Sequence, residues 1–320
     1  MKLISTLRIF VAILFLISPI DILCEKIPKY TLQNHDQRKL EQKINYIRVE
    51  YGKEATYKAK EFKSYYKQSI DYITYKGHIV DLEKEFTIEA NTIIEIFFSE
   101  SITTLKYLFD GYDDDNCKRI KLIDLSHFNS SSVETTNSMF EGCSSLEEIN
   151  FDNFDTSKVT NMYDMFEGCS NLKSLDLSNF NTLQVTSMET MFKGCSNLKS
   201  LDLSNFDTSK VTNIVNMFYN CSSLEFLDIS NFNTLNVIEY PSYKMFLLVY
   251  SLKYLNLYNV QIDKNQNRIK KSLESIIQKS TTVCQKDDFE IDSNLTYIKR
   301  CCDFNLETSS CDPDNYIKIK

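Results

Sequence analysis

The middle of the chain repeats one pattern of hydrophobic and polar positions every 26 residues. In the copy that begins at Cys169, residues 175–177 (Leu-Asp-Leu) alternate apolar and polar side chains, which predicts a strand with one buried face. Val185, Met188 and Phe192 follow at spacings of three and four, which predicts one face of a short helix. Each copy is therefore expected to form a strand, a turn, a short helix and a second turn.

The small size of each copy predicts that the copies stack. About eight apolar side chains per copy, worth roughly 1.5–3 kcal/mol each when buried, cannot offset roughly 1–2 kcal/mol of backbone ordering per residue. Stacked copies share their buried faces, so we expect an α/β leucine-rich-repeat solenoid of about six to seven rungs. It would carry a parallel sheet on one face and short helices on the other. The cysteines that mark the copies are Cys117, Cys143, Cys169, Cys195 and Cys221.

Residues 1–24 have the features of a signal peptide. Lys2 and Arg8 precede an apolar run over residues 9–20, which is shorter than a membrane span. We expect cleavage near Cys24 and an extracellular protein, secreted or held at the cell surface. An uncleaved anchor and lipidation of Cys24 are the alternatives.

The repeats occupy residues 88–262, with a degenerate first rung expected at residues 93–109. Residues 25–87 are charged and rich in tyrosine, and a helix-like spacing predicts a helical amino-terminal flank or cap. Residues 263–320 are expected to form a capping helix followed by a tail that contains disulfides. The spacing that predicts the flanking helix is that of Ile44, Ile47 and Tyr51, and the capping helix is predicted by Ile269, Leu273, Ile276 and Ile277.

Two columns of polar residues are expected on the outer face of the sheet, one residue from each rung. One interpretation is a solvated face that keeps the solenoid soluble. The other is a binding face for a basic partner or for divalent cations, because the sheet surface of a solenoid commonly binds partners. Serine and aspartate at rung spacing do not form a calcium loop, so no metal site is expected. The candidate binding residues are Asp124, Asn150, Asp176, Asp202 and Asp228 in one column and Asp152, Ser178, Ser204 and Ser230 in the other.

The cysteines form two groups. Those of the repeat are interpreted as buried thiols, although the strand spacing of about 4.8 Å would also permit disulfides between adjacent rungs. Four further cysteines lie off the repeat in a polar segment, where disulfides are favoured in a secreted chain. Their pairing is open. They are Cys284, Cys301, Cys302 and Cys311.

Three acceptor motifs for N-glycosylation occur, at Asn129, Asn220 and Asn294. They matter only in a eukaryotic host. Asn220 replaces the glycine of other rungs, which predicts an exposed turn.

Charge and motif content argue against several classes of protein. The net charge of −8, without a clustered basic face, argues against nucleic acid as a partner. The three histidines are scattered, and no nucleophile elbow, phosphate loop or zinc-protease motif is present. We therefore expect no enzymatic activity and no cofactor.

Three motifs recur together at one fixed spacing: Leu-Asp-Leu-Ser-Asn-Phe, Val-Thr-Asn-Met and Met-Phe-x-Gly-Cys. The repeat that they form resembles the BspA-like leucine-rich repeat family of bacterial, mycoplasma and protist surface proteins, over roughly residues 93–260. The resemblance implies a cell-surface location and adhesion to host, matrix or neighbouring-cell proteins. The function expected is a binding module that recognises an unknown protein ligand through the sheet face. The alternative is a structural coat protein that self-associates.

Overall fold

A computed structural model describes the chain within one compact unit that begins at Asn45. The predicted signal peptide lies outside the described residues. Among the residues that are described, no helix is both long and apolar enough to span a bilayer. The described residues are 45–58, 69–81, 85–98, 101–110, 117–238, 244–262, 267–277 and 281–284.

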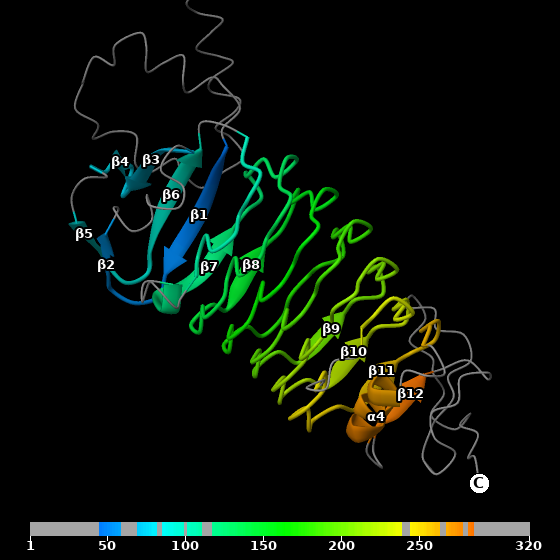
Figure 1. The fold of residues 1–320 in the computed structure, drawn as a ribbon. Coiled ribbons are helices and arrows are strands. Elements are labelled where there is room, and N and C mark those ends of the chain that lie inside the picture. The colour runs from blue at the N-terminus through cyan, green and yellow to red at the C-terminus, as the bar shows by residue number, and fades with distance from the viewer. Residues whose placement is uncertain are drawn as a thin grey trace, which may run out of the picture. The chain divides into compact units, whose positions relative to one another are not determined.

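The amino-terminal flank is built from strands, so the prediction of a helical flank is wrong for its described part (Figure 1). Ile47 and Tyr51 are four residues apart, as on a helix, but Val49 between them is also buried, and this alternation is that of a strand. The β-branched side chains of Ile47 and Val49 favour the same structure. The strands are β1 (Tyr46–Tyr51), β2 (Ala55–Lys58), β3 (Ile70–Tyr75), β4 (His78–Ile79), β5 (Glu85–Ile88) and β6 (Thr92–Phe98).

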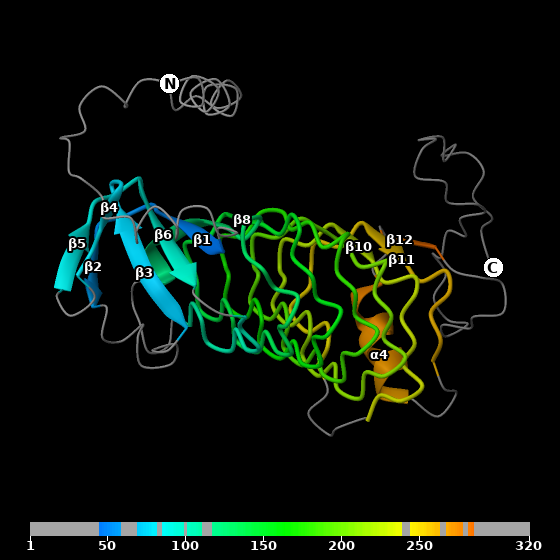
Figure 2. The same ribbon diagram turned by 90° about the horizontal axis from the view of Figure 1, so that it is seen from above.

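The repeats form parallel strands on one side of a stack of turns (Figures 1 and 2). We number the rungs from their cysteines: rung 1 begins at Cys117, rung 2 at Cys143, rung 3 at Cys169, rung 4 at Cys195 and rung 5 at Cys221. After the 3-10 turn η1 (Cys117–Arg119), the strands are β7 (Ile120–Asp124), β8 (Glu148–Asn150), β9 (Ser200–Asp202), β10 (Phe226–Asp228), β11 (Tyr254–Asn256) and β12 (Thr282–Cys284).

Strand β7 joins the two kinds of sheet. It pairs antiparallel with β1 on one edge and parallel with β8 on the other. The resulting mixed sheet has the order β4-β3-β6-β1-β7-β8, and a separate parallel sheet has the order β12-β11-β10-β9. The flank therefore covers the open edge of the first rung, which would otherwise be free to pair with another chain.

The segments predicted as short helices are tight turns, so the predicted α/β fold class is wrong. The Lys193 N–H donates to Thr190 O, three residues back, instead of making the four-residue bond of an α-helix. The Phe192 N–H leaves its own rung and donates to Met217 O at 3.0 Å. Thr190 and Gly194 have φ angles of 55° and 77°, which a right-handed helix excludes. Spacings of three and four arise here because each turn returns an apolar side chain to the core.

Stacked phenylalanine rings fill the core. Successive centroids are 5.9, 5.5, 5.6, 5.8 and 5.2 Å apart. The first ring, that of Phe109, belongs to residues 101–110. Thr104 in the same segment forms a parallel β-bridge with Thr135 of rung 1. Residues 101–110 therefore form part of a rung that precedes rung 1. Ile93, expected in that rung, lies instead in β6. The rings are those of Phe109, Phe140, Phe166, Phe192, Phe218 and Phe246.

A short helix lies beyond the last complete rung, as predicted. Helix α4 (Asn267–Ile276) is the one α-helix among the described residues. It buries Ile269, Leu273 and Ile276, each at most 2% exposed. Strand β12 then pairs with β11 and extends the parallel sheet by one strand.

One glycine position tests the turn geometry. Gly168 has a φ of 72°, and a Cβ added there would lie 3.4 Å from the Cα of Gly142 in the rung before. Asn220 occupies the equivalent position with a φ of 59°. Gly168→Ala is expected to lower the free energy of unfolding by about 1–2 kcal/mol, because alanine resists this conformation. Gly168→Asn should cost clearly less. Equal losses in urea titrations of the two variants would contradict this geometry.

Candidate functional site

The predicted polar columns lie on the outer side of the parallel strands. Asp124 pairs in register with Asn150, and Asp202 pairs with Asp228. Each residue of the first column also accepts a hydrogen bond within its own turn. The Ser178 N–H, for example, donates to Asp176 Oδ1 at 2.9 Å. The first column thus has a structural role, which the sequence interpretation missed. The signal was available, because aspartate side chains often accept a hydrogen bond from the backbone amide two residues later in a turn.

Exposure along the columns is uneven. Asp152, Asp176, Ser178 and Asp202 are exposed. In rung 5 the same columns are buried, and Asp228 and Ser230 are only 2% and 7% exposed. We call the outward-facing residues of rungs 2 to 4 the polar face: Glu147, Glu148, Asp152, Lys173, Asp176, Ser178, Lys199, Asp202 and Ser204.

The polar face carries net negative charge. Its five carboxylates outnumber its two lysines, and Lys173 is paired with Glu147 at 2.8 Å. The amide and hydroxyl of Ser178 hydrogen-bond the carboxylate of Asp176 and lower its pKa. Asp176 therefore stays ionised well below neutral pH. The arrangement can attract and hold cationic groups.

The same aspartate turn also occurs at another corner of the rungs. The Ser157 N–H donates to Asp155 Oδ1 at 2.8 Å, and the Ser209 N–H donates to Asp207 Oδ1 at 2.8 Å. The turn alone therefore does not identify a binding site. The polar face differs from the same columns in rung 5 by its exposure, because Asp228 and Ser230 are buried there.

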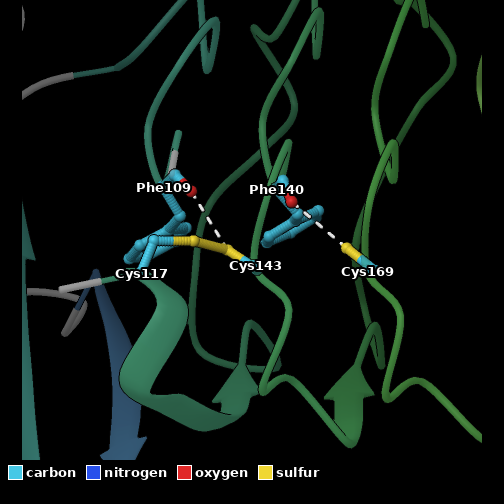
Figure 3. The surroundings of a disulfide bond; sticks show 5 residues. All are labelled: Phe109, Cys117, Phe140, Cys143 and Cys169. Atoms are coloured by element: carbon cyan, nitrogen blue, oxygen red, sulfur yellow. Dashed lines mark hydrogen bonds between the residues drawn. A yellow bond between two sulfur atoms is a disulfide. The ribbon is translucent and has the colours of Figure 1, made fainter. Parts of the chain in front are cut away.

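The repeat cysteines divide into a disulfide and free thiols (Figure 3). Cys117 and Cys143 form a disulfide across rungs 1 and 2, with their Cα atoms 5.0 Å apart, so the interpretation as thiols is wrong for this pair. Cys169, Cys195 and Cys221 are buried thiols, as expected. They donate to the carbonyls of Phe140, Phe166 and Phe192 at 3.1, 3.2 and 3.1 Å.

Burial raises the pKa of the three thiols. They are therefore protonated at neutral pH and unreactive. Cys284 is buried in β12, whereas Cys301, Cys302 and Cys311 lie outside the described residues. Disulfides in the tail stay a prediction.

The glycosylation candidates differ in their surroundings. Asn129 is exposed, but its Oδ1 accepts the Ser131 hydroxyl at 2.8 Å. Asn220 is half-buried, and its N–H donates to Leu247 O at 2.8 Å. Asn294 lies outside the described residues. Modification of any of the three stays a prediction.

A cluster of carboxyl groups that the sequence analysis missed lies away from the polar face. Oxygens of Glu141, Asp164 and Glu167 lie within 4.8 Å of one another and could hold a cation. The Thr190 hydroxyl donates to Asp164, and Lys193 pairs with Glu167 at 2.5 Å. An alignment of the rungs would have revealed it, because Glu141 and Glu167 occupy the same position in consecutive rungs.

Asp164 binds its proton tightly. Burial, together with the hydrogen bond and charge of Glu167, raises its pKa to about 8. The folded chain therefore holds a proton here that the unfolded chain releases near pH 4. Such a group stabilises the fold at acidic pH, and its contribution is lost as the pH rises through about 8.

Replacement of Asp164 by Asn should remove this pH dependence. Asn216 occupies the equivalent position two rungs later, so the site accepts the amide. Relative to the unmodified chain, Asp164→Asn is expected to raise the unfolding temperature at pH 8.5 by several degrees more than at pH 5. Differential scanning calorimetry at both pH values would measure this, with the exposed Asp155→Asn as control. The same shift at both pH values would refute it.

The comparisons with known proteins agree with the repeat. A family model described as "Mycoplasma protein of unknown function, DUF285" matches the chain in four overlapping stretches, residues 54–172, 103–201, 147–255 and 169–283. No curated protein and no solved structure matches the chain. The resemblance to BspA-like proteins stays a prediction. Because the matches together extend over more than two thirds of the 320 residues, the chain belongs to the DUF285 family of Mycoplasma proteins of unknown function.

Proposed function

We propose that this chain is a secreted or cell-surface binding module, without catalytic activity, that recognises a basic segment of a protein ligand through the polar face. The observation that carries the proposal is the set of exposed carboxylates on rungs 2 to 4, those of Glu148, Asp152, Asp176 and Asp202. The signal-like residues 1–24 are the basis for the extracellular location.

The polar face is suited to binding because its charges are already in place. The aspartates at 176 and 202 are each held by a hydrogen bond of 2.9 Å to the amide two residues later. A partner therefore does not have to immobilise these side chains, which reduces the entropy lost on association. Asp176 and Asp202 occupy the same column on adjacent rungs, so one cationic segment that crosses the rungs can contact both.

Charge on the face would influence partner choice more than total affinity. Exposed ion pairs contribute about 0–1 kcal/mol each. Several acting together increase the association rate and exclude acidic partners. Binding through this face should therefore weaken as the salt concentration rises.

The proposal can be tested without disturbing the turns. The triple variant Asp152→Asn, Asp176→Asn and Asp202→Asn removes the three charges but keeps a side-chain oxygen that can accept a hydrogen bond. Asn150 shows that an asparagine can do this in the first column, because its Oδ1 accepts the Asp152 N–H at 2.9 Å. Binding of the labelled full chain to surfaces coated with extracellular matrix is expected to fall about tenfold. Thermal stability should not change.

The matched control is Asp155→Asn with Asp207→Asn, which removes charge from the other corner of the rungs. It should leave binding intact. If the triple variant binds as well as the unmodified chain, recognition does not use the polar face. If the control variant weakens binding equally, general charge rather than this face is responsible.

A further inference from the structure

One turn of the repeat alternates between two sequences from rung to rung. It reads DTSK at residues 155–158 of rung 2 and at residues 207–210 of rung 4. It reads NTLQ at residues 181–184 of rung 3 and NTLN at residues 233–236 of rung 5. The third position of this turn is therefore serine in rungs 2 and 4 and leucine in rungs 3 and 5.

The turn has the same structure with serine or with leucine at its third position. The Ser157 N–H donates to Asp155 Oδ1 at 2.8 Å, and the Leu183 N–H donates to Asn181 Oδ1 at 3.1 Å. Leu183 and Leu235 are 49% and 50% exposed, so about half of each side chain lies outside the core. The fold therefore does not require leucine in these two rungs, whereas burial against a partner would make use of its apolar surface.

The backbone that carries the two leucines is held by the neighbouring rungs. The Thr182 hydroxyl donates to Asp207 O, and the Thr208 hydroxyl donates to Asn233 O, both at 2.9 Å. These bonds join rung 3 to rung 4 and rung 4 to rung 5 at the turn itself. A partner that binds the leucines does not have to order this backbone, which reduces the entropy lost on association.

Projections and notches alternate along the third position of the turn. Leu183 and Leu235 project, and the shorter side chains of Ser157 and Ser209 leave a notch beside each leucine. The phenylalanine rings directly before the turns of rungs 2, 3 and 4 have successive centroids 6.1 and 6.5 Å apart. Two such steps separate the leucines, which leaves space for another leucine side chain between them at Ser209.

This pattern is complementary to itself, so it fits a second copy of the chain. Two copies related by a two-fold axis contribute the same surface to their contact. In an antiparallel pair, rung 3 of one copy can face rung 4 of the other, and rung 5 then faces rung 2. Leu183 meets Ser209 of the second copy, and Leu235 meets Ser157. In a parallel pair leucine would face leucine, and each notch would stay empty.

The fourth position of the turn supports the antiparallel pairing. It is lysine in rungs 2 and 4, Lys158 and Lys210, and an amide in rungs 3 and 5, Gln184 and Asn236. The antiparallel pair sets each lysine against an amide of the other copy, so like charges are kept apart. Lysine and amide are compatible here, because Lys210 Nζ donates to Gln184 Oε1 at 2.8 Å within one chain.

We propose that the third and fourth positions of this turn in rungs 2 to 5, here called the turn surface, join two copies of the chain as an antiparallel dimer. The leucines of each copy fill the serine notches of the other, and the lysines face amides. The inference goes beyond the proposed function, because the turn surface lies outside the polar face and binds a second copy rather than a foreign ligand.

The double variant Leu183→Ser and Leu235→Ser tests the dimer, because rungs 2 and 4 already use serine at this position. In sedimentation velocity over a series of concentrations, the unmodified full chain is expected to shift from monomer to dimer as its concentration rises. The double variant should stay monomeric, and calorimetry establishes that it is folded. An unmodified chain that stays monomeric throughout, or a double variant that dimerises equally well, would overturn the inference.

Filling the notches tests how the two copies are arranged. The matched variant Ser157→Leu and Ser209→Leu carries the residue that rungs 3 and 5 use, and it adds apolar surface. In the antiparallel pair the new leucines collide with those of the other copy, so the dissociation constant of the dimer should rise by about tenfold or more. Tighter association would show that general apolar contact or a parallel pair is responsible, and the antiparallel pairing would be refuted.

The same measurement separates this inference from the proposed function. The triple variant Asp152→Asn, Asp176→Asn and Asp202→Asn leaves the turn surface unchanged, so it should dimerise as the unmodified chain does. If it loses the dimer, the copies associate through the polar face and the inference fails. If it dimerises normally while its binding to matrix is unchanged, the turn surface stands and the polar face is refuted.

Discussion

The constraint that governs this structure is that each rung must find its hydrogen-bond partners in its neighbours. A single copy of 26 residues makes three-residue turn bonds of its own, but alternate amides such as that of Phe192 point along the stack. Buried amides without partners are costly, so the backbone of one rung is stable only against the next. The ring stack and the thiol-to-carbonyl bonds follow the same direction, because they join equivalent positions of successive rungs.

This constraint explains what could be predicted from the sequence. The repeat period, the stacking and the outer position of the aspartate columns follow from hydrophobic spacing alone. The prediction of short helices was wrong, because a spacing of three and four fits both a helical face and a series of tight turns that return to one core. The distinguishing residues were available: a position that accepts Ser138, Asp164, Thr190 and Asn216 with φ angles of 52–56° is not a helix interior.

The flank and the first cysteine pair were mispredicted for related reasons. A spacing of four from Ile47 to Tyr51 hid the alternation completed by Val49, and the partners of β1 lie far away in sequence, at β6 and β7. Equal spacing of the cysteines gave no ground to single out one pair. Cys117 begins the first full rung, next to the flank. The carboxyl cluster at Asp164 required side chains of adjacent rungs to be placed together.

The functional information in such an array lies in its departures from regularity. Along the aspartate columns every rung has nearly the same chemistry, yet the columns are half-buried in rung 1 and buried in rung 5, and their exposed residues lie in rungs 2 to 4. Within that part, twelve identical residues form a paired strand in one rung and not in the other. The residues that precede these two segments differ, because Phe151 of rung 2 stands where rung 3 has Leu177. Identical segments of such a repeat therefore have different surroundings, because each rung packs on the core of the rungs beside it.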